Sequence, residues 1–257
     1  MPIQPIDSLR LYEQVAKQIS ELIRAGEFPP GRRLPAERDL AKTLGVSRPV
    51  VREAMIALEI AGLVEVRTGS GAYVRERRVD AAPPLNVGDS PSDILNARML
   101  IEGEIAALAA SSATPTDVVA MANLIDQMTR DHDAGRPWDW ADLGFHGAIA
   151  AATGNAALAA VVERLWQEQH APVFAILSER VRLRENWPAT LSGHIAVFEA
   201  IRDRQPAAAK AAMRAHLSQV LGVMTGEANG EAADGEERAE PPAESAPPPT
   251  PPRRARR

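Results

Sequence analysis

The chain contains no cysteine among its 257 residues, so it forms no disulfide and offers no thiolate to a metal. Aromatic residues make up only 4% of the sequence, while alanine is frequent, which favours helices that pack through small side chains. No apolar run approaches the ~20 residues that span a bilayer. The first residues, MPIQPIDSLRLYEQ, lack the apolar stretch of a signal peptide. By elimination, we expect a cytoplasmic protein with no membrane partner.

The net charge of −5 is unfavourable for binding nucleic acid, but the charges are unevenly distributed. Residues 1–78 hold 13 Lys and Arg against 10 Asp and Glu, whereas the remainder holds 16 against 24. The N-terminal part is therefore slightly basic and the rest is acidic. The excess is too small to identify a DNA-binding domain, so the motifs must decide.

Residues 1–78 show the pattern of three helices followed by a hairpin. Apolar residues at helical spacing predict a helix over 9–25, and a second short helix is expected over 36–44. A third helix opens at the N-cap Ser47 and ends at a glycine. The segments LVEVR and AYVRE alternate apolar and polar residues on either side of GSG, which predicts two strands. This order is that of a winged helix-turn-helix.

The rest of the chain is predicted to be mostly helical, so the fold class is mostly α. Residues 79–90 have the composition of a linker, and residues 91–226 form an antiparallel helical bundle in this prediction. Residues 227–257 are acidic, then proline-rich, then basic, and we expect them to be a disordered tail. The expected helices of the bundle lie near 91–112, 115–134, 138–153, 155–182 with a bend at Pro172, 188–204 and 206–224.

The third helix carries the residues that suit DNA recognition. In a winged helix-turn-helix, the N-terminal end of this helix enters the major groove. Arg48 and Arg52 are four residues apart on one face, and the planar fork of arginine matches O6 and N7 of guanine. Ser47 and Arg38 are expected to contact phosphates, which position the protein. The alternative is that Arg38 and Arg52 pair with nearby carboxylates on solvated faces.

The segment FPPGRRLPAERDLAKTLGVSRPVVREAMIALEIAGLVEVRTGSGAYV closely resembles the DNA-binding domain of the GntR family of bacterial regulators. The resemblance covers residues 11–75 almost without gaps. It implies DNA contacts at a set of residues that spans the second helix, the third helix and the wing, namely Arg38, Ser47, Arg48, Arg52, Thr68 and Gly69. Because one recognition helix covers only a few base pairs, we expect a homodimer on a pseudo-palindromic double-stranded operator.

Three histidines and an aspartate in the second half suggest a metal site. Asp142 lies four residues before His146, so both side chains point the same way on a helix. His194 and His216 each lie near the middle of a later helix. Three imidazoles and one carboxylate suit a divalent ion such as Zn²⁺, Ni²⁺ or Mn²⁺. The alternative is that these histidines are only hydrogen-bonded or partly exposed.

Residues 91–224 resemble the FadR-type C-terminal ligand-binding domain that follows many GntR DNA-binding domains. The similar segments are NARMLIEGEIAALAA, DLGFH, ATGNAAL, GHIAVFEAI and AAMRAHL. The resemblance implies metal binding by Asp142, His146, His194 and His216. It also implies that Arg98 binds an effector carboxylate beside the metal, whereas a purely structural Arg98–Glu102 pair is the alternative. His132 and His170 match no ligand position, and Asn155 is expected to be a helix cap.

The segment RLWQEQHAPVFAILSERVRLRENW is most like the hexuronate-responsive regulators of this family. The resemblance therefore implies a small carboxylate effector, with a sugar acid as the first choice and lactate- or pyruvate-type acids as near neighbours. Our first hypothesis is a ligand-controlled repressor. A metalloenzyme is the alternative from another class, but no acid, base or nucleophile is evident beside the ligands. A third hypothesis is a regulator in which the metal is only a structural staple.

Overall fold

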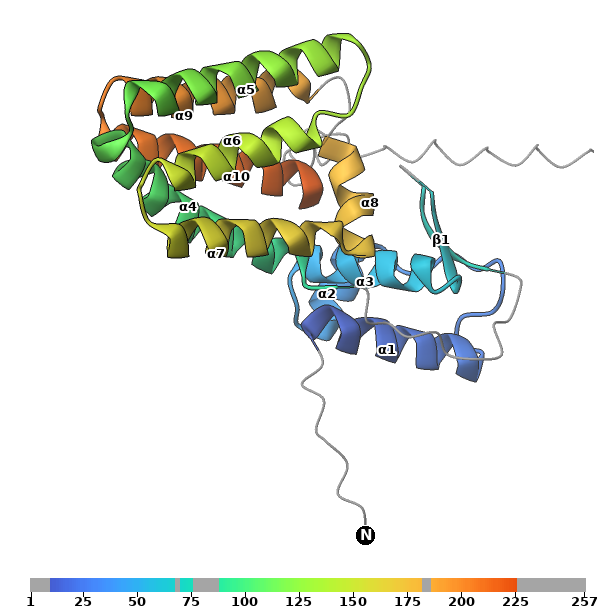
Figure 1. Ribbon diagram of the computed structural model, residues 1–257. Helices are drawn as coiled ribbons and strands as arrows, with labels where there is room; N and C mark the ends of the chain where they lie inside the picture. The colour runs from blue at the N-terminus through green and yellow to red at the C-terminus, as the bar shows by residue number, and fades with distance from the viewer. Residues whose placement is uncertain (1–9, 68–69, 76–87, 182–185, 226–257) are drawn as a thin grey trace, which may run out of the picture.

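The computed structural model describes residues 10–67, 70–75, 88–181 and 186–225. Two lobes are visible in Figure 1, one built from α1–α3 and the β-hairpin and the other from α4–α10. The predicted tail at 227–257, most of the predicted linker and the wing residues Thr68 and Gly69 lie outside the described residues. No described helix is both long enough and apolar enough to cross a membrane.

The N-terminal lobe has the predicted winged helix-turn-helix order. Glycines in the left-handed conformation follow α1 and α2, where a side chain would be strained. The two strands pair antiparallel, with Val64 opposite Val74 and Arg67 opposite Gly71. The elements are α1 (Leu11–Ala25), α2 (Glu37–Leu44), α3 (Arg48–Ile60), β1 (Val64–Arg67) and β2 (Gly71–Val74).

The C-terminal lobe is entirely helical in the described residues. The side chains of Ser90, Thr114 and Asn155 accept hydrogen bonds from the first turns of α4, α5 and α7, which confirms Asn155 as a helix cap. The helices are α4 (Pro91–Ser112), α5 (Pro115–Asp133), α6 (Asp139–Ala151), α7 (Ala156–Gln167), α8 (Pro172–Val181), α9 (Trp187–Arg202) and α10 (Pro206–Thr225), with a 3₁₀ turn, η1 (Glu168–His170), after α7.

The prediction of one bent helix over 155–182 was wrong. The structure has α7, then η1, then a separate helix α8 that runs in another direction (Figure 1). Pro172 has no N–H to continue the helical ladder, and it disfavours helical geometry at the residue before it. Ala171 is accordingly extended, with φ −61° and ψ 143°. The break frees α8 to lie between the bundle and α3.

The core of the bundle depends on small side chains, as the composition suggested. Helix α10 packs most extensively on α4 and α9. Ala106 and Ala109 of α4 and Ala209 of α10 are completely buried. Because these side chains are short, neighbouring helices can approach closely and bury the residues between them.

The two lobes are joined by polar contacts around the start of α4. The Tyr12 hydroxyl donates to the Gly88 carbonyl at 2.6 Å, and Arg10 pairs with Asp89. Glu53 of α3 accepts hydrogen bonds from Ser90 and from the backbone N–H of the residue after Pro91. The described end of the predicted linker is therefore held against α1 and α3.

Candidate metal centre and DNA-binding surface

The structure brings together the four residues predicted to bind metal. His146 lies on α6, His194 on α9 and His216 on α10, and one nitrogen from each lies within 4.8 Å of the others. Asp142, one turn before His146, places Oδ1 2.8 Å from His194 Nε2 and 3.5 Å from His146 Nε2. The spacing of Asp142 and His146 was visible in the sequence, but only the packing of three helices unites the set.

The electrostatics of this cluster suit a cation. Burial, and then the neighbouring imidazoles of His194 and His146, lower the pKa of His216 well below its ordinary value. His216 is therefore neutral at physiological pH, as a metal ligand must be. Burial raises the pKa of Asp142, but the adjacent histidines outweigh it and lower the pKa overall. Asp142 is therefore a carboxylate.

Two buried nitrogen atoms in the cluster lack a hydrogen-bond partner among the described residues. These atoms are Nδ1 of His194 and Nδ1 of His216. A buried polar atom without a partner is costly, and an unrecorded ion is one ordinary explanation. Gly193 leaves room for this arrangement, because a Cβ there would lie only 2.6 Å from His216 Nδ1. The donor set and these partnerless atoms fit the divalent ion that the sequence predicted.

Glu102 is the residue of this site that the sequence analysis considered only as a partner for Arg98. One carboxylate oxygen lies 2.5 Å from His146 Nδ1, and the other end of the carboxylate meets Arg98 Nε at 2.5 Å. Burial raises the pKa of Glu102, but Arg98 and His146 lower it to about 2. Glu102 thus orients the His146 ring so that Nε2 faces Asp142, a role typical of a carboxylate behind a metal-bound histidine.

Arg98 lies in the cavity beside this cluster and is only 3% exposed. Its Nε and Nη2 contact Glu102, and its guanidinium carbon stands 4.4 Å from the centre of the Trp166 ring. The structural pair with Glu102 therefore forms, as the alternative predicted. It uses one edge of the guanidinium, and no contact recorded among the described residues uses Nη1.

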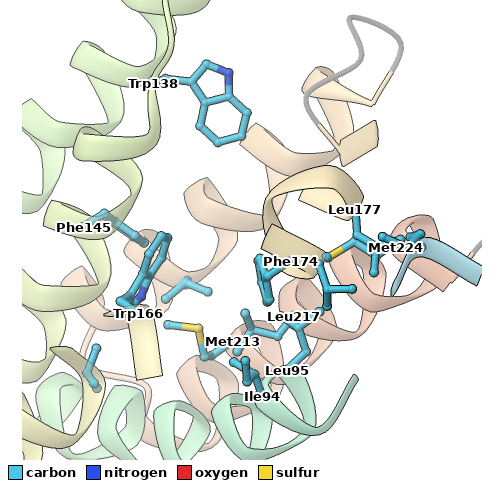
Figure 2. Packing of buried hydrophobic residues seen from close by; sticks show 14 of the residues in the cluster. Ile94, Leu95, Trp138, Phe145, Trp166, Phe174, Leu177, Met213, Leu217 and Met224 are labelled. Carbon is cyan, nitrogen blue, oxygen red and sulfur yellow. The ribbon is translucent and has the colours of Figure 1, made fainter. Parts of the chain in front are cut away.

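The cavity has a volume of about 410 Å³, within the ordinary range of small-molecule sites. Arg98, Asp142, His146 and His216 form its polar wall. Its apolar wall, part of which is labelled in Figure 2, includes Leu95, Trp138, Trp166, Phe174, Leu217 and Met224. A small ligand in this cavity touches both the candidate metal ligands and Arg98.

The two histidines without a predicted ligand role lie apart from the cluster. His132 stacks on Trp187 with ring centres 4.4 Å apart, so it is a packing residue as expected. His170 is exposed, but it also lines the cavity, which the sequence analysis did not predict. The reason is the break after α7, which turns η1 towards the cavity.

The predicted DNA-binding residues cluster around the start of α3. Ser47 and Arg48 are both exposed there, and Ser47 makes no side-chain capping bond. Arg38 on α2 is also exposed, and its contact with Asp39 is long at 3.8 Å. Such an exposed pair contributes little and leaves the guanidinium able to reach a phosphate. These three side chains are accessible to DNA.

Arg52 differs from its neighbours. Its Nη2 lies 2.6 Å from Glu37 Oε2, its Nε lies 3.3 Å from Oε1, and the side chain is only 14% exposed. This pairing is the alternative that the sequence left open for Arg52. It fastens α3 to α2. A base contact by Arg52 therefore requires that it share or leave this pair.

A winged helix-turn-helix joined to a helical domain with a histidine-lined cavity defines a ligand-sensing transcription regulator. Residues 11–74 match the model described as bacterial regulatory proteins, gntR family, and residues 93–219 match the FCD domain. The chain therefore belongs to the GntR family of transcription regulators, and its C-terminal part is an FCD domain. This confirms both resemblances drawn from the sequence. It also confirms the expectation of a regulator over that of an enzyme.

Three relatives show the extent of the likeness. The Exu regulon transcriptional regulator of Escherichia coli is 41% identical over 216 residues, which cover 81% of this chain and 82% of that protein. The Uxu operon transcriptional regulator of the same species is 37% identical over 222 residues, covering 82% and 85%. The HTH-type transcriptional repressor NanR of Klebsiella aerogenes is 29% identical over 227 residues, covering 84% and 86%.

Proposed function

We propose that the protein is a repressor of carbohydrate-acid catabolism genes whose operator binding is controlled by a small carboxylate at a divalent-metal site. The observation that carries this proposal is a single cavity that exposes Asp142, His146, His216 and Arg98 to the same small ligand. Cationic groups on one wall and apolar side chains on the other suit an organic acid.

Asp142, His146, His194 and His216 would hold the ion. When bound, a Zn²⁺, Ni²⁺ or Mn²⁺ ion supplies positive charge and coordination positions for oxygen ligands. Glu102 supports the site from behind by orienting His146, and it also holds Arg98 in place. Because Glu102 occupies the Nε edge of Arg98, the Nη1 side remains to donate to an effector carboxylate. The structural pair and the effector role are therefore compatible.

The similarity to the Exu regulon and Uxu operon regulators supports a sugar acid as the effector. It agrees with the resemblance to hexuronate-responsive regulators in the segment that includes Trp166. The relative described as a transcriptional repressor supports repression as the mode of action. On this proposal the protein works in the bacterial cytoplasm, where its operator lies.

The proposed DNA complex is a homodimer on a pseudo-palindromic operator. A single α3 reaches only a few base pairs, and a two-fold pair of such helices reads two half-sites. Arg48 and Ser47 at the start of α3 face outward, as this geometry requires. Leu100 and Leu108 on α4 are 62% and 51% exposed, which gives the bundle an apolar surface for a second copy.

Metal analysis and calorimetry on three proteins test the effector site. The wild type is expected to hold one divalent ion per chain and to bind a sugar acid. Arg98→Ala is expected to keep the ion but to bind the acid weakly, whereas His194→Ala loses both. If wild type holds the ion but binds no acid in the cavity, the metal is a structural staple and the proposal is wrong.

A further inference from the structure

Two hydrogen-bond donors in the cavity wall have no partner among the described residues. They are the indole Nε1–H of Trp166 and the amide Nε2 of Gln169, and both atoms are buried. Trp166 itself is only 7% exposed. Both side chains line the cavity that holds Arg98 and the histidines. A buried donor that lacks an acceptor is destabilising, so each calls for an oxygen atom that the protein alone does not supply.

The two donors come from one short segment and lie beside the carboxylate-binding groups. Trp166 is in the last turn of α7 and Gln169 is in η1, three residues further on, a spacing that brings side chains to the same side of such a turn. The Trp166 ring is held by the Arg98 guanidinium at 4.4 Å and by the His146 ring at 5.6 Å. Figure 2 shows the Trp166 ring with its indole nitrogen in blue.

We propose that Trp166 and Gln169 donate hydrogen bonds to hydroxyl or carbonyl oxygens of the effector, beyond its carboxylate group. This inference rests on the proposed function, because it assumes that Arg98 and the metal ligands bind the carboxylate. It adds the class of acid that the site selects. An acid with oxygens along its carbon chain satisfies both donors, whereas an unsubstituted aliphatic acid of equal length leaves them buried and partnerless. The site therefore selects polyhydroxylated acids by the cost of leaving its own donors unmade.

Calorimetry with matched six-carbon acids tests this inference on the metal-loaded protein. The hydroxylated probes are D-galacturonate, D-glucuronate and D-gluconate, and hexanoate is the unsubstituted probe. We expect the wild type to bind at least one hydroxylated acid more tightly than hexanoate. Trp166→Phe keeps an aromatic ring against Arg98 but removes the N–H, and Gln169→Met keeps the length of the side chain but removes the amide. Each variant is expected to weaken the hydroxylated acid by about tenfold, the effect of one lost hydrogen bond in a buried site, without weakening hexanoate.

Trp140→Phe is the matched control. Trp140 lines the same cavity but is 58% exposed, and its side chain hydrogen-bonds Asp131. The same chemical change there is expected to leave every affinity within about twofold of wild type, since its donor is already used. Metal content and thermal unfolding, measured on all variants, show whether the cavity is intact.

The outcomes separate this inference from the function on which it rests. If the wild type binds hexanoate as tightly as every hydroxylated acid, or if Trp166→Phe and Gln169→Met bind the hydroxylated acid like wild type, the inference is overturned and carboxylate sensing survives. If the metal-loaded wild type binds none of the four acids, the proposed sensing of six-carbon acids fails and this inference fails with it. Equal weakening of hexanoate in both variants also overturns the inference, because it indicates a general defect of the cavity.

Discussion

The Ser90 hydroxyl donates a hydrogen bond to Glu53 Oε2 at 2.9 Å, and this contact joins the recognition helix α3 to the first turn of α4. The backbone N–H of Ser92 donates to the other oxygen of Glu53 at 3.0 Å. Glu53 is only 2% exposed, and burial raises the pKa of its carboxyl. Two turns further along α4 stands Arg98. One helix thus connects the DNA-reading end of the molecule with the candidate effector site.

Glu53→Ala is expected to weaken the link between effector and operator. The change leaves the Ser90 hydroxyl and the Ser92 N–H without their buried acceptor, so the free energy of unfolding should fall by about 1–3 kcal/mol. Metal and acid affinities should be unchanged, because Glu53 does not touch the cavity, whereas the effect of acid on operator affinity should shrink. Denaturant titration and operator titration with and without acid measure both effects.

Glu21→Ala serves as the control for this experiment. Glu21 is exposed on α1, so its removal is expected to change neither stability nor coupling appreciably. Full coupling in Glu53→Ala would show that the signal crosses between the lobes elsewhere, for example through the contact of α8 with α3.

Arg48→Ala is expected to lower operator affinity by about 1–3 kcal/mol and to relax the base preference at one position of each half-site. The reason is that Arg48 is exposed at the start of α3 and free to direct its guanidinium at a base edge. Binding curves on operators with single base changes measure the preference. Arg24→Ala, an exposed arginine on α1, should leave the preference intact. An unchanged preference in Arg48→Ala would assign base reading to another residue.

Gly193→Ala is expected to reduce metal affinity although it removes no ligand. The added Cβ would lie 2.6 Å from Nδ1 of His216 and so would push that ring out of the cluster. Gly147→Ala is a matched control, because Gly147 follows His146 on α6 as closely as Gly193 precedes His194, and a Cβ there meets nothing within 4 Å. Metal titration should separate the two variants. Equal affinity in both would show that His216 is not a ligand.

Glu102→Gln is expected to lower metal affinity by about 10–100-fold, the usual effect of removing a partner that orients a histidine ligand. The loss arises because the amide cannot hold His146 and Arg98 as the carboxylate does. Glu104→Gln, two residues further along α4, tests the same change at a surface pair with Lys210. Competition with a chromogenic chelator gives both affinities, and a normal affinity in Glu102→Gln would contradict the orienting role.

Local signals in the sequence predicted much of the fold. Ser90-Pro91 and Thr114-Pro115 mark the starts of α4 and α5, because the cap and the fixed φ of proline act within a few residues. The break at Ala171 was underestimated, since the choice between a bent helix and two helices depends on what α8 packs against. That partner, α3, lies more than a hundred residues earlier.

The candidate site was predictable only in part. The four-residue spacing of Asp142 and His146 is local, but their meeting with His194 and His216 was inferred from a resemblance, not from spacing. Glu102 and Glu53 were missed as functional groups because their partners, His146 and Ser90, lie 44 and 37 residues away. A carboxylate on a helix gives no sequence signal that distinguishes a buried bridge from a surface charge.

Operator titration of metal-loaded and fully demetallated protein, each with and without a hydroxylated six-carbon acid, tests the central claim most directly. The account predicts that both forms bind operator, because the DNA contacts lie in the other lobe, and that acid weakens binding only in the metal-loaded form. Linkage then requires the operator complex to bind the acid more weakly by the same factor. An equal response to acid in the demetallated protein would contradict the account and leave the metal a structural role.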